Sequence, residues 1–135
     1  MSQENVEVFR RATDAYNRRD VEAMLATVDP EVEWRPLLPV LLGGKATVYR
    51  GHEGVREGVR ELDEVFSELE AEQSEVRDLG EQVIAIGHFR GRGRESGAKT
   101  ETAIVWLVEF KNGKAIRVRE YLDPKEALEA AGLRE

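Results

Sequence analysis

The residues best suited to chemistry lie near the end of the chain, in IRVREYLDPKE (116–126). Read as a strand, this stretch places Ile116, Val118 and Leu122 on one face, and Glu120 falls on the same apolar face. A carboxylate there must be neutral, paired with a cation or open to a wet cavity, because an isolated dry charge is very costly. Burial raises a carboxyl pKa towards neutrality, which suits a group that takes and returns protons.

Three interpretations of Glu120 stay open at the level of sequence. The side chain acts as an acid–base catalyst, lines a ligand pocket without doing chemistry, or forms a structural ion pair with an arginine such as Arg35 or Arg90. His88 is the second catalytic candidate, because period-two alternation puts it on one face with Ile84 and Ile86. If that face looks into the same cavity, His88 pairs with Glu120. A structural, hydrogen-bonded histidine is the alternative.

Large apolar residues predict the walls of a pocket around Glu120. Trp34 and Trp106 point inward by the same alternation and offer flat surfaces to a ring-shaped ligand, although core filling is the other role open to each. The stretch LLPVLLGGKATVYR (37–50) has no regular period and predicts a loop that covers the pocket. The predicted ligand-binding residues are Trp34, Trp106, Tyr49, Val118, Leu122, Leu38 and Leu41.

Composition excludes several other kinds of site. The chain has no cysteine and only two histidines, far apart, so neither a thiolate nor a metal centre is expected. The glycines at 91 and 93 are not followed by the lysine of a phosphate-binding loop. The basic run RGRGR (90–94) reads as a solvated strand edge, and a net charge of −7 argues against nucleic acid. We expect no cofactor.

The size and hydropathy of the chain predict one globular domain over residues 1–135. No apolar run approaches the length of a membrane span, and the start MSQENVEVFRR lacks the apolar part of a signal peptide. These patterns predict a cytoplasmic protein that does not associate with membranes.

The element order predicts an α+β fold. Helices are expected over 3–19, after Asp20 and after Gly51, and strands over 31–36, 82–94, 100–110 and 116–122, with 69–79 weakly patterned. Asn112-Gly113 predicts a tight hairpin, and Asp123-Pro124 caps a short terminal helix. Glycines at 87, 91 and 93 indicate a bent sheet. The result is a cone-shaped, curved antiparallel sheet wrapped around three N-terminal helices, with a short C-terminal helix and a cavity that the helices do not fill.

This order of elements resembles the SnoaL-like proteins of the nuclear transport factor 2-like superfamily. The resemblance is carried by AYNRRDVEAMLATVDPEVEW (15–34), YRGHEGVRE (49–57), GRGRESG (91–97) and KNGKAIRVREYLDPKEALEAAGL (111–133). It implies this fold over nearly the whole chain. It does not imply one activity, because proteins with this fold have many different functions.

Two groups within the superfamily imply different things about the site. Ketosteroid isomerases use a base aspartate, a tyrosine and a second acid at places that match Trp34, Ala12 and Trp106 here, so their constellation is absent. Polyketide cyclases of the SnoaL type resemble the last strand, where their acid–base aspartate matches Glu120 and a histidine matches Val118. The resemblance therefore implies an acid–base role for Glu120 without that histidine.

The outer face of strand 100–110 predicts a partner. Ala103, Val105 and Leu107 lie in its middle, between Glu101 and Glu109, and are too apolar to face water. A homodimer packed sheet to sheet would cover them, as is common in related folds. Together these patterns predict a cofactor-independent isomerase or cyclase for a small apolar, cyclic molecule. A non-catalytic ligand-binding or dimerisation module is the alternative.

Overall fold

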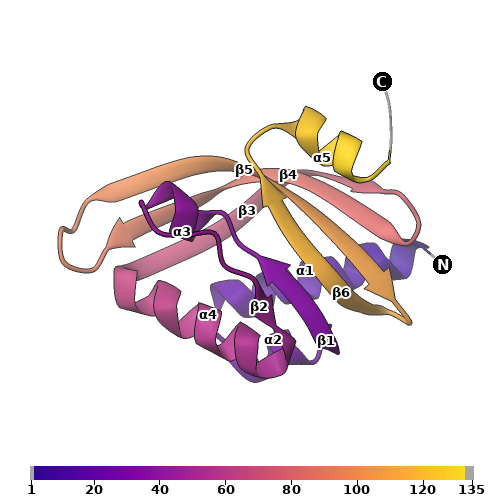
Figure 1. The fold of residues 1–135 in the computed structure, drawn as a ribbon, viewed down its shortest axis with the longest axis horizontal. Helices are drawn as coiled ribbons and strands as arrows, with labels where there is room; N and C mark the ends of the chain where they lie inside the picture. The colour runs from indigo at the N-terminus through magenta and orange to yellow at the C-terminus, as the bar shows by residue number, and fades with distance from the viewer. Residues whose placement is uncertain (1, 133–135) are drawn as a thin grey trace.

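A computed structural model describes residues 2–132 as one curved sheet with five helices (Figure 1). The helices are α1 (Ser2–Asn17), α2 (Val21–Leu25), α3 (Leu38–Leu41), α4 (Gly51–Val65) and α5 (Pro124–Ala130). The strands are β1 (Val28–Arg35), β2 (Tyr49–Arg50), β3 (Phe66–Asp78), β4 (Gln82–Gly93), β5 (Lys99–Lys111) and β6 (Lys114–Tyr121). Within the described residues, no helix is both long and apolar enough to cross a membrane.

The sheet has six strands in the order β2-β1-β6-β5-β4-β3. Neighbouring strands are antiparallel except β1 and β6, which run parallel. The predicted α+β fold is confirmed, but the sheet is mixed and not wholly antiparallel, because the last strand of the chain enters between β1 and β5. Figure 1 shows α1, α2 and α4 on the concave side of the sheet and α5 on the other side.

Local signals at turns and helix ends are confirmed. Asn112 and Gly113 both have positive φ, 52° and 78°, as a two-residue hairpin turn requires. The side chain of Asp20 accepts a hydrogen bond from the Ala23 N–H at the start of α2, and Asp123 accepts one from the Lys125 N–H at the start of α5. The Asn112-Gly113 turn and the Asp123 cap mark where β6 begins and ends.

The strand predicted only weakly over 69–79 is longer than expected. β3 starts at Phe66, directly after α4 ends at Val65, and runs to Asp78. Two register shifts against β4, at Phe66/Glu68 and Gln73/Glu75, break the period-two alternation along it. β3 is also an edge strand whose outer side chains are charged, so its sequence lacks the apolar run of a central strand.

The apolar outer face of β5 is covered within the chain. Val105 and Leu107 are buried together with Ile84 and with Ala127 of α5, forming a small second core on the convex side of the sheet. The premise for a sheet-to-sheet dimer is therefore wrong at these two residues, because α5 already removes them from water. A homodimer stays a prediction, and it would have to use the part of this face beyond α5.

Gly87 lies in the middle of β4, where β3 approaches closely. A Cβ atom there would lie 1.9 Å from the carbonyl oxygen of Glu72, a backbone atom that cannot rotate away. We expect Gly87→Ala to lower the free energy of unfolding by about 1–3 kcal/mol, measured by urea denaturation. Gly93→Ala is the matched control in the same strand, because the nearest atom there is the rotatable hydroxyl of Ser96 at 2.6 Å. Equal losses in both variants would contradict this explanation.

Candidate active site

Glu120 projects from β6 into the concave side of the sheet. Trp106 on β5 lies directly beside it in the strand register, and Val118, two residues earlier on β6, lies beside Trp34 on β1. The carboxylate is 9% exposed. The backbone N–H of Leu37 donates to its Oε1 at 2.9 Å, and the indole Nε1–H of Trp34 donates to its Oε2 at 3.4 Å. Both oxygens of Glu120 are thus held from the segment that leaves β1.

Burial dominates the protonation of Glu120. Removal from water raises the pKa of the carboxyl to about 7, although the hydrogen bonds from Leu37 and Trp34 oppose this by favouring the charged form. The predicted alternative of an arginine partner is wrong: Arg35 lies 3.7 Å from Glu33, and Arg90 pairs with Glu72 and Glu101. Among the described residues no cation pairs with Glu120, so no ion pair offsets the effect of burial on its pKa.

Glu120 opens onto an apolar cavity of about 120 Å³, which we call the main cavity. Its aromatic wall is formed by Trp106, with Phe89 at a centroid distance of 5.3 Å and Phe9 at 6.4 Å, both edge-on. The remaining lining residues are Val8, Ala12, Thr13, Tyr16, Met24, Thr27, Val28, Val32, Trp34, Val55, Ala71, Gln73, Val108, Phe110, Ala115 and Val118. Glu120 is the one acidic or basic side chain on this wall among the described residues.

Four of the predicted site residues meet in the main cavity, namely Glu120, Trp34, Trp106 and Val118. The other predicted ligand-binding residues lie elsewhere. Leu122 and Leu41 are 52% and 42% exposed, because Leu122 follows the end of β6 and Leu41 lies on the outer side of α3. Leu38 is buried in the core and is not on the cavity wall.

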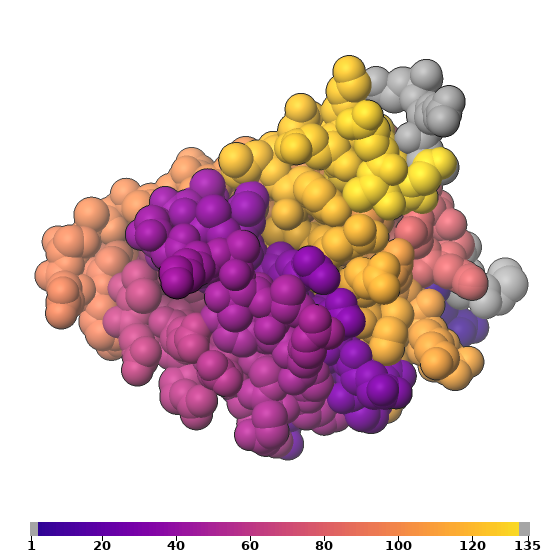
Figure 2. Space-filling view, viewed as in Figure 1, coloured from indigo at the N-terminus to yellow at the C-terminus, as the bar shows by residue number. Residues whose placement is uncertain are grey.

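The predicted cover over residues 37–50 does not line the main cavity. This segment contains the short helix α3 and lies at the surface in the view of Figure 2. It closes a separate space of about 230 Å³ against α4, which we call the second hollow. Its lining residues are Trp34, Pro36, Pro39, Leu42, Gly44, Tyr49, Gly58, Glu61, Leu62 and Val65. Tyr49 is therefore in the second hollow, where its hydroxyl donates to Glu61.

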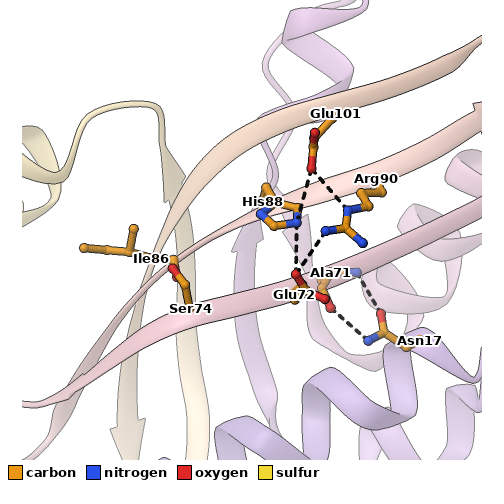
Figure 3. Close-up of polar contacts among 8 residues, drawn as sticks. All are labelled: Asn17, Ala71, Glu72, Ser74, Ile86, His88, Arg90 and Glu101. Carbon is orange, nitrogen blue, oxygen red and sulfur yellow. Dashed lines mark hydrogen bonds and ion pairs between the residues drawn. The ribbon is translucent and has the colours of Figure 1, made fainter.

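His88 faces away from the main cavity, so its predicted pairing with Glu120 is wrong. Figure 3 shows His88 between two carboxylates on the convex side of the sheet. Its Nε2 lies 3.2 Å from Glu72 on β3 and 3.4 Å from Glu101 on β5, and Arg90 bridges the same two acids. The alternation was read correctly, since Ile84 and Ile86 also lie on this face. That face, however, is the one under and beside α5.

The wall of the main cavity also carries polar side chains on α1 and β3, and sequence reasoning missed Thr13 and Gln73 among them. Tyr16 on α1 has a buried hydroxyl without a hydrogen-bond partner among the described residues, and burial raises the pKa of this phenol. Gln73 on β3 donates to the hydroxyl of Thr13 on α1. Thr13 and Tyr16 share the inward stripe of the first predicted helix, and that shared stripe is the signal that could have placed Thr13 here.

Other kinds of site receive no support from the geometry of residues 2–132. No group of three or more histidine and acidic side chains is arranged to hold a metal ion in that range. The glycines at 91 and 93 lie within β4 and do not open a helix, unlike those of a phosphate-binding loop.

The curved sheet around α1, α2 and α4 is a nuclear transport factor 2-like α+β fold. A nuclear transport factor 2-like protein of unknown function from Burkholderia pseudomallei is similar over 93% of this chain and 95% of its own, with a TM-score of 0.79 and 24% identity. A family model described as the SnoaL-like domain matches residues 9–118. The chain belongs to the SnoaL-like domain family.

Two further solved structures are similar to this chain. TerC, co-crystallized with polyporic acid, shares 24% identity with a TM-score of 0.78, covering 89% of this chain and 92% of its own. A provisionally assigned polyketide cyclase from Xanthomonas campestris shares 17% identity with a TM-score of 0.70, covering 92% of this chain and 93% of its own. No curated protein gives a significant match. At these identities the likeness establishes the fold.

Proposed function

We propose that this protein is a cofactor-independent acid–base enzyme of the isomerase or cyclase type that acts on a small apolar, cyclic molecule. The observation that carries the proposal is the buried carboxyl of Glu120, which has no cation partner among the described residues and whose pKa is raised to about 7 at the wall of an apolar cavity. A group with that pKa is present in both protonation states at neutral pH, so it can accept a proton and give it back.

The reaction class follows from what Glu120 can do in this setting. Ionised Glu120 takes a proton from a ligand carbon, the electron pair of the broken C–H bond is delocalised into the ligand, and Glu120 returns the proton at another atom. No electrons are gained or lost, so the cycle needs no redox partner. Leu37 and Trp34 hold the carboxylate in place, and the unpartnered hydroxyl of Tyr16 supplies a hydrogen-bond donor for an oxygen of the ligand.

Relatives support this class without fixing a substrate. The similar protein from Xanthomonas campestris is provisionally assigned as a polyketide cyclase, and TerC was crystallized with a small organic acid, polyporic acid. The ketosteroid isomerase constellation is absent, because Trp34, Ala12 and Trp106 stand at its three places. Any isomerase activity here therefore depends on Glu120 in β6.

A non-catalytic ligand-binding module is the second candidate. It is favoured by the composition of the main cavity, where Glu120 has no second acid or base beside it among the described residues. In this case Glu120 orients a ligand by hydrogen bonding and its raised pKa is only a consequence of burial. The same pocket and the same ligand class serve both candidates.

The titration of Glu120 and the identity of a retained ligand test the proposal together. We expect the carboxyl carbon of Glu120, followed by ¹³C NMR and assigned with Glu120→Gln, to titrate with a midpoint near 7, as burial dictates. Native mass spectrometry of protein purified from its own host should show a retained small organic molecule. A midpoint near the ordinary glutamate value of 4.5 would remove the basis for proton transfer by Glu120.

A further inference from the structure

We propose that Trp34 determines which ligands the main cavity accepts, by closing it off from the second hollow. Trp34 is the one residue that lines both spaces among the described residues. On one side its indole reaches Glu120, and on the other it meets the space beneath α3. The second hollow thereby becomes the extension that a longer apolar ligand would occupy. This inference rests on the proposed function for the position of the ligand's polar end, at Glu120.

Volume shows why the position of Trp34 matters. An apolar cavity of about 150 Å³ holds a benzene molecule, so the main cavity, at about 120 Å³, accepts roughly one ring. The second hollow adds about 230 Å³. Each space alone lies below the roughly 300–1,000 Å³ of common small-molecule pockets, and the two together fall within that range. With the indole of Trp34 in place, the main cavity has room for about one ring. Without it, the two spaces would join into one pocket of drug-like size.

The contacts of Trp34 show that it is a fixed partition. A Cβ atom added at Gly58 would lie 2.4 Å from Cζ3 of Trp34, so the indole rests directly on the backbone of α4. The ring of Tyr49 lies at a centroid distance of 5.4 Å on the second-hollow side. The hydrogen bond to Glu120 holds the Nε1 edge. Contacts from three elements thus hold the side chain in this position between the two spaces.

The second hollow suits an uncharged apolar extension. Pro36, Pro39 and Leu42 line it together with Leu62 and Val65 of α4. Its one acidic group, Glu61, already accepts a hydrogen bond from the hydroxyl of Tyr49. A ligand that reaches this space should therefore carry an alkyl or aryl tail opposite the polar group that contacts Glu120.

The test is a binding series of 4-alkylphenols, from 4-methylphenol to 4-octylphenol, measured by calorimetry on the full chain. In wild-type protein, affinity should rise by about fourfold for each methylene that enters the main cavity, and then stop rising once the tail meets Trp34. In Trp34→Val, the rise should continue for several more carbons as the tail enters the second hollow. Valine keeps the β propensity of this position.

Trp106→Val is the matched control. It removes the same indole from the wall of the main cavity but opens no path to the second hollow, because Trp106 lines only the main cavity. The tail length at which affinity stops rising, which we call the length limit, should therefore change less in Trp106→Val than in Trp34→Val. Equal changes would overturn the inference. Loss of the Trp34 hydrogen bond to Glu120 changes the affinity of every phenol alike, so it moves the intercept of the series and not the length limit.

Trp34→Phe keeps the inference testable if Trp34→Val does not fold. Its smaller ring leaves part of the gap open, so the length limit should lie between those of wild type and an open partition. An unchanged limit in a folded variant overturns the inference. If wild-type protein binds no phenol of any length while Trp34→Val binds the long ones, the partition is supported. If neither binds any, the ligand site itself fails, and the proposed function fails with it.

Discussion

Replacement of Glu120 by glutamine should abolish turnover while leaving the fold and ligand binding in place. Glutamine has nearly the same shape, and its side-chain oxygen can still accept the Leu37 N–H, but it cannot take up a proton. General acid–base groups contribute about 10²–10⁴-fold to rate, so we expect a loss of that size. The measurement is deuterium incorporation from D₂O into cyclohexanone, a one-ring ketone with exchangeable C–H groups, followed by NMR.

Glu109→Gln is the control for this experiment. Glu109 lies on β5 and pairs with Arg117 at 3.1 Å and Arg119 at 3.3 Å, outside the main cavity. Removing its charge perturbs the sheet surface without touching the wall of the site, so the exchange rate should stay at the wild-type level. An exchange rate in Glu120→Gln equal to that in Glu109→Gln would remove Glu120 from the mechanism and leave the non-catalytic binding module as the function.

The position of Glu120 could be predicted because β6 has two chemically different faces. Arg117 and Arg119 point to the convex side, so alternation assigns Val118 and Glu120 to the concave side without ambiguity. The Asn112-Gly113 turn alone would pair Trp106 with Arg119, and a register shift between Glu109 and Phe110 is what places Trp106 opposite Glu120. Where the two faces of a strand differ chemically, alternation along that strand predicts which face each side chain takes, whereas the bulge that sets the cross-strand pairing is not visible in the sequence.

The orientation of His88 could not be predicted because β4 is apolar on both faces. Val83 and Ala85 are buried on the concave side, while Ile84 is buried under α5 on the convex side. Alternation then groups residues by face but does not say which face holds the cavity. That information lies in the packing of α5, a helix some 40 residues further along the chain.

The hydrogen bond from the Leu37 N–H to Glu120 could not be predicted from the sequence either. It joins residues 83 positions apart and uses a backbone N–H, which leaves no trace in side-chain patterns. The same contact ties Glu120 to the start of the segment that closes the second hollow. A backbone donor to a buried carboxylate is a tertiary feature, and only coordinates reveal it.

The buried carboxyl should also make the stability of the protein depend on pH. The pKa of Glu120 is about 7 in the folded state, against an ordinary value of 4.5 that applies when the chain is unfolded. Between these values the folded state binds more protons at this site than the unfolded state, so the free energy of unfolding falls as pH rises. The stabilisation is complete below about 4.5 and is lost once the pH passes about 7.

The expected size of this effect follows from 1.36 kcal/mol per pKa unit, which gives a loss of about 3 kcal/mol across the window. Other groups titrate as well, so the measured quantity is the difference in unfolding free energy between wild type and Glu120→Gln, from urea denaturation at steps between pH 4 and 8. Glutamine shifts stability by a constant and does not titrate. The unfolding free energy of the variant should therefore increase relative to that of wild type as pH rises, and the difference should become constant above pH 7. A difference that does not change with pH would mean that Glu120 is not desolvated.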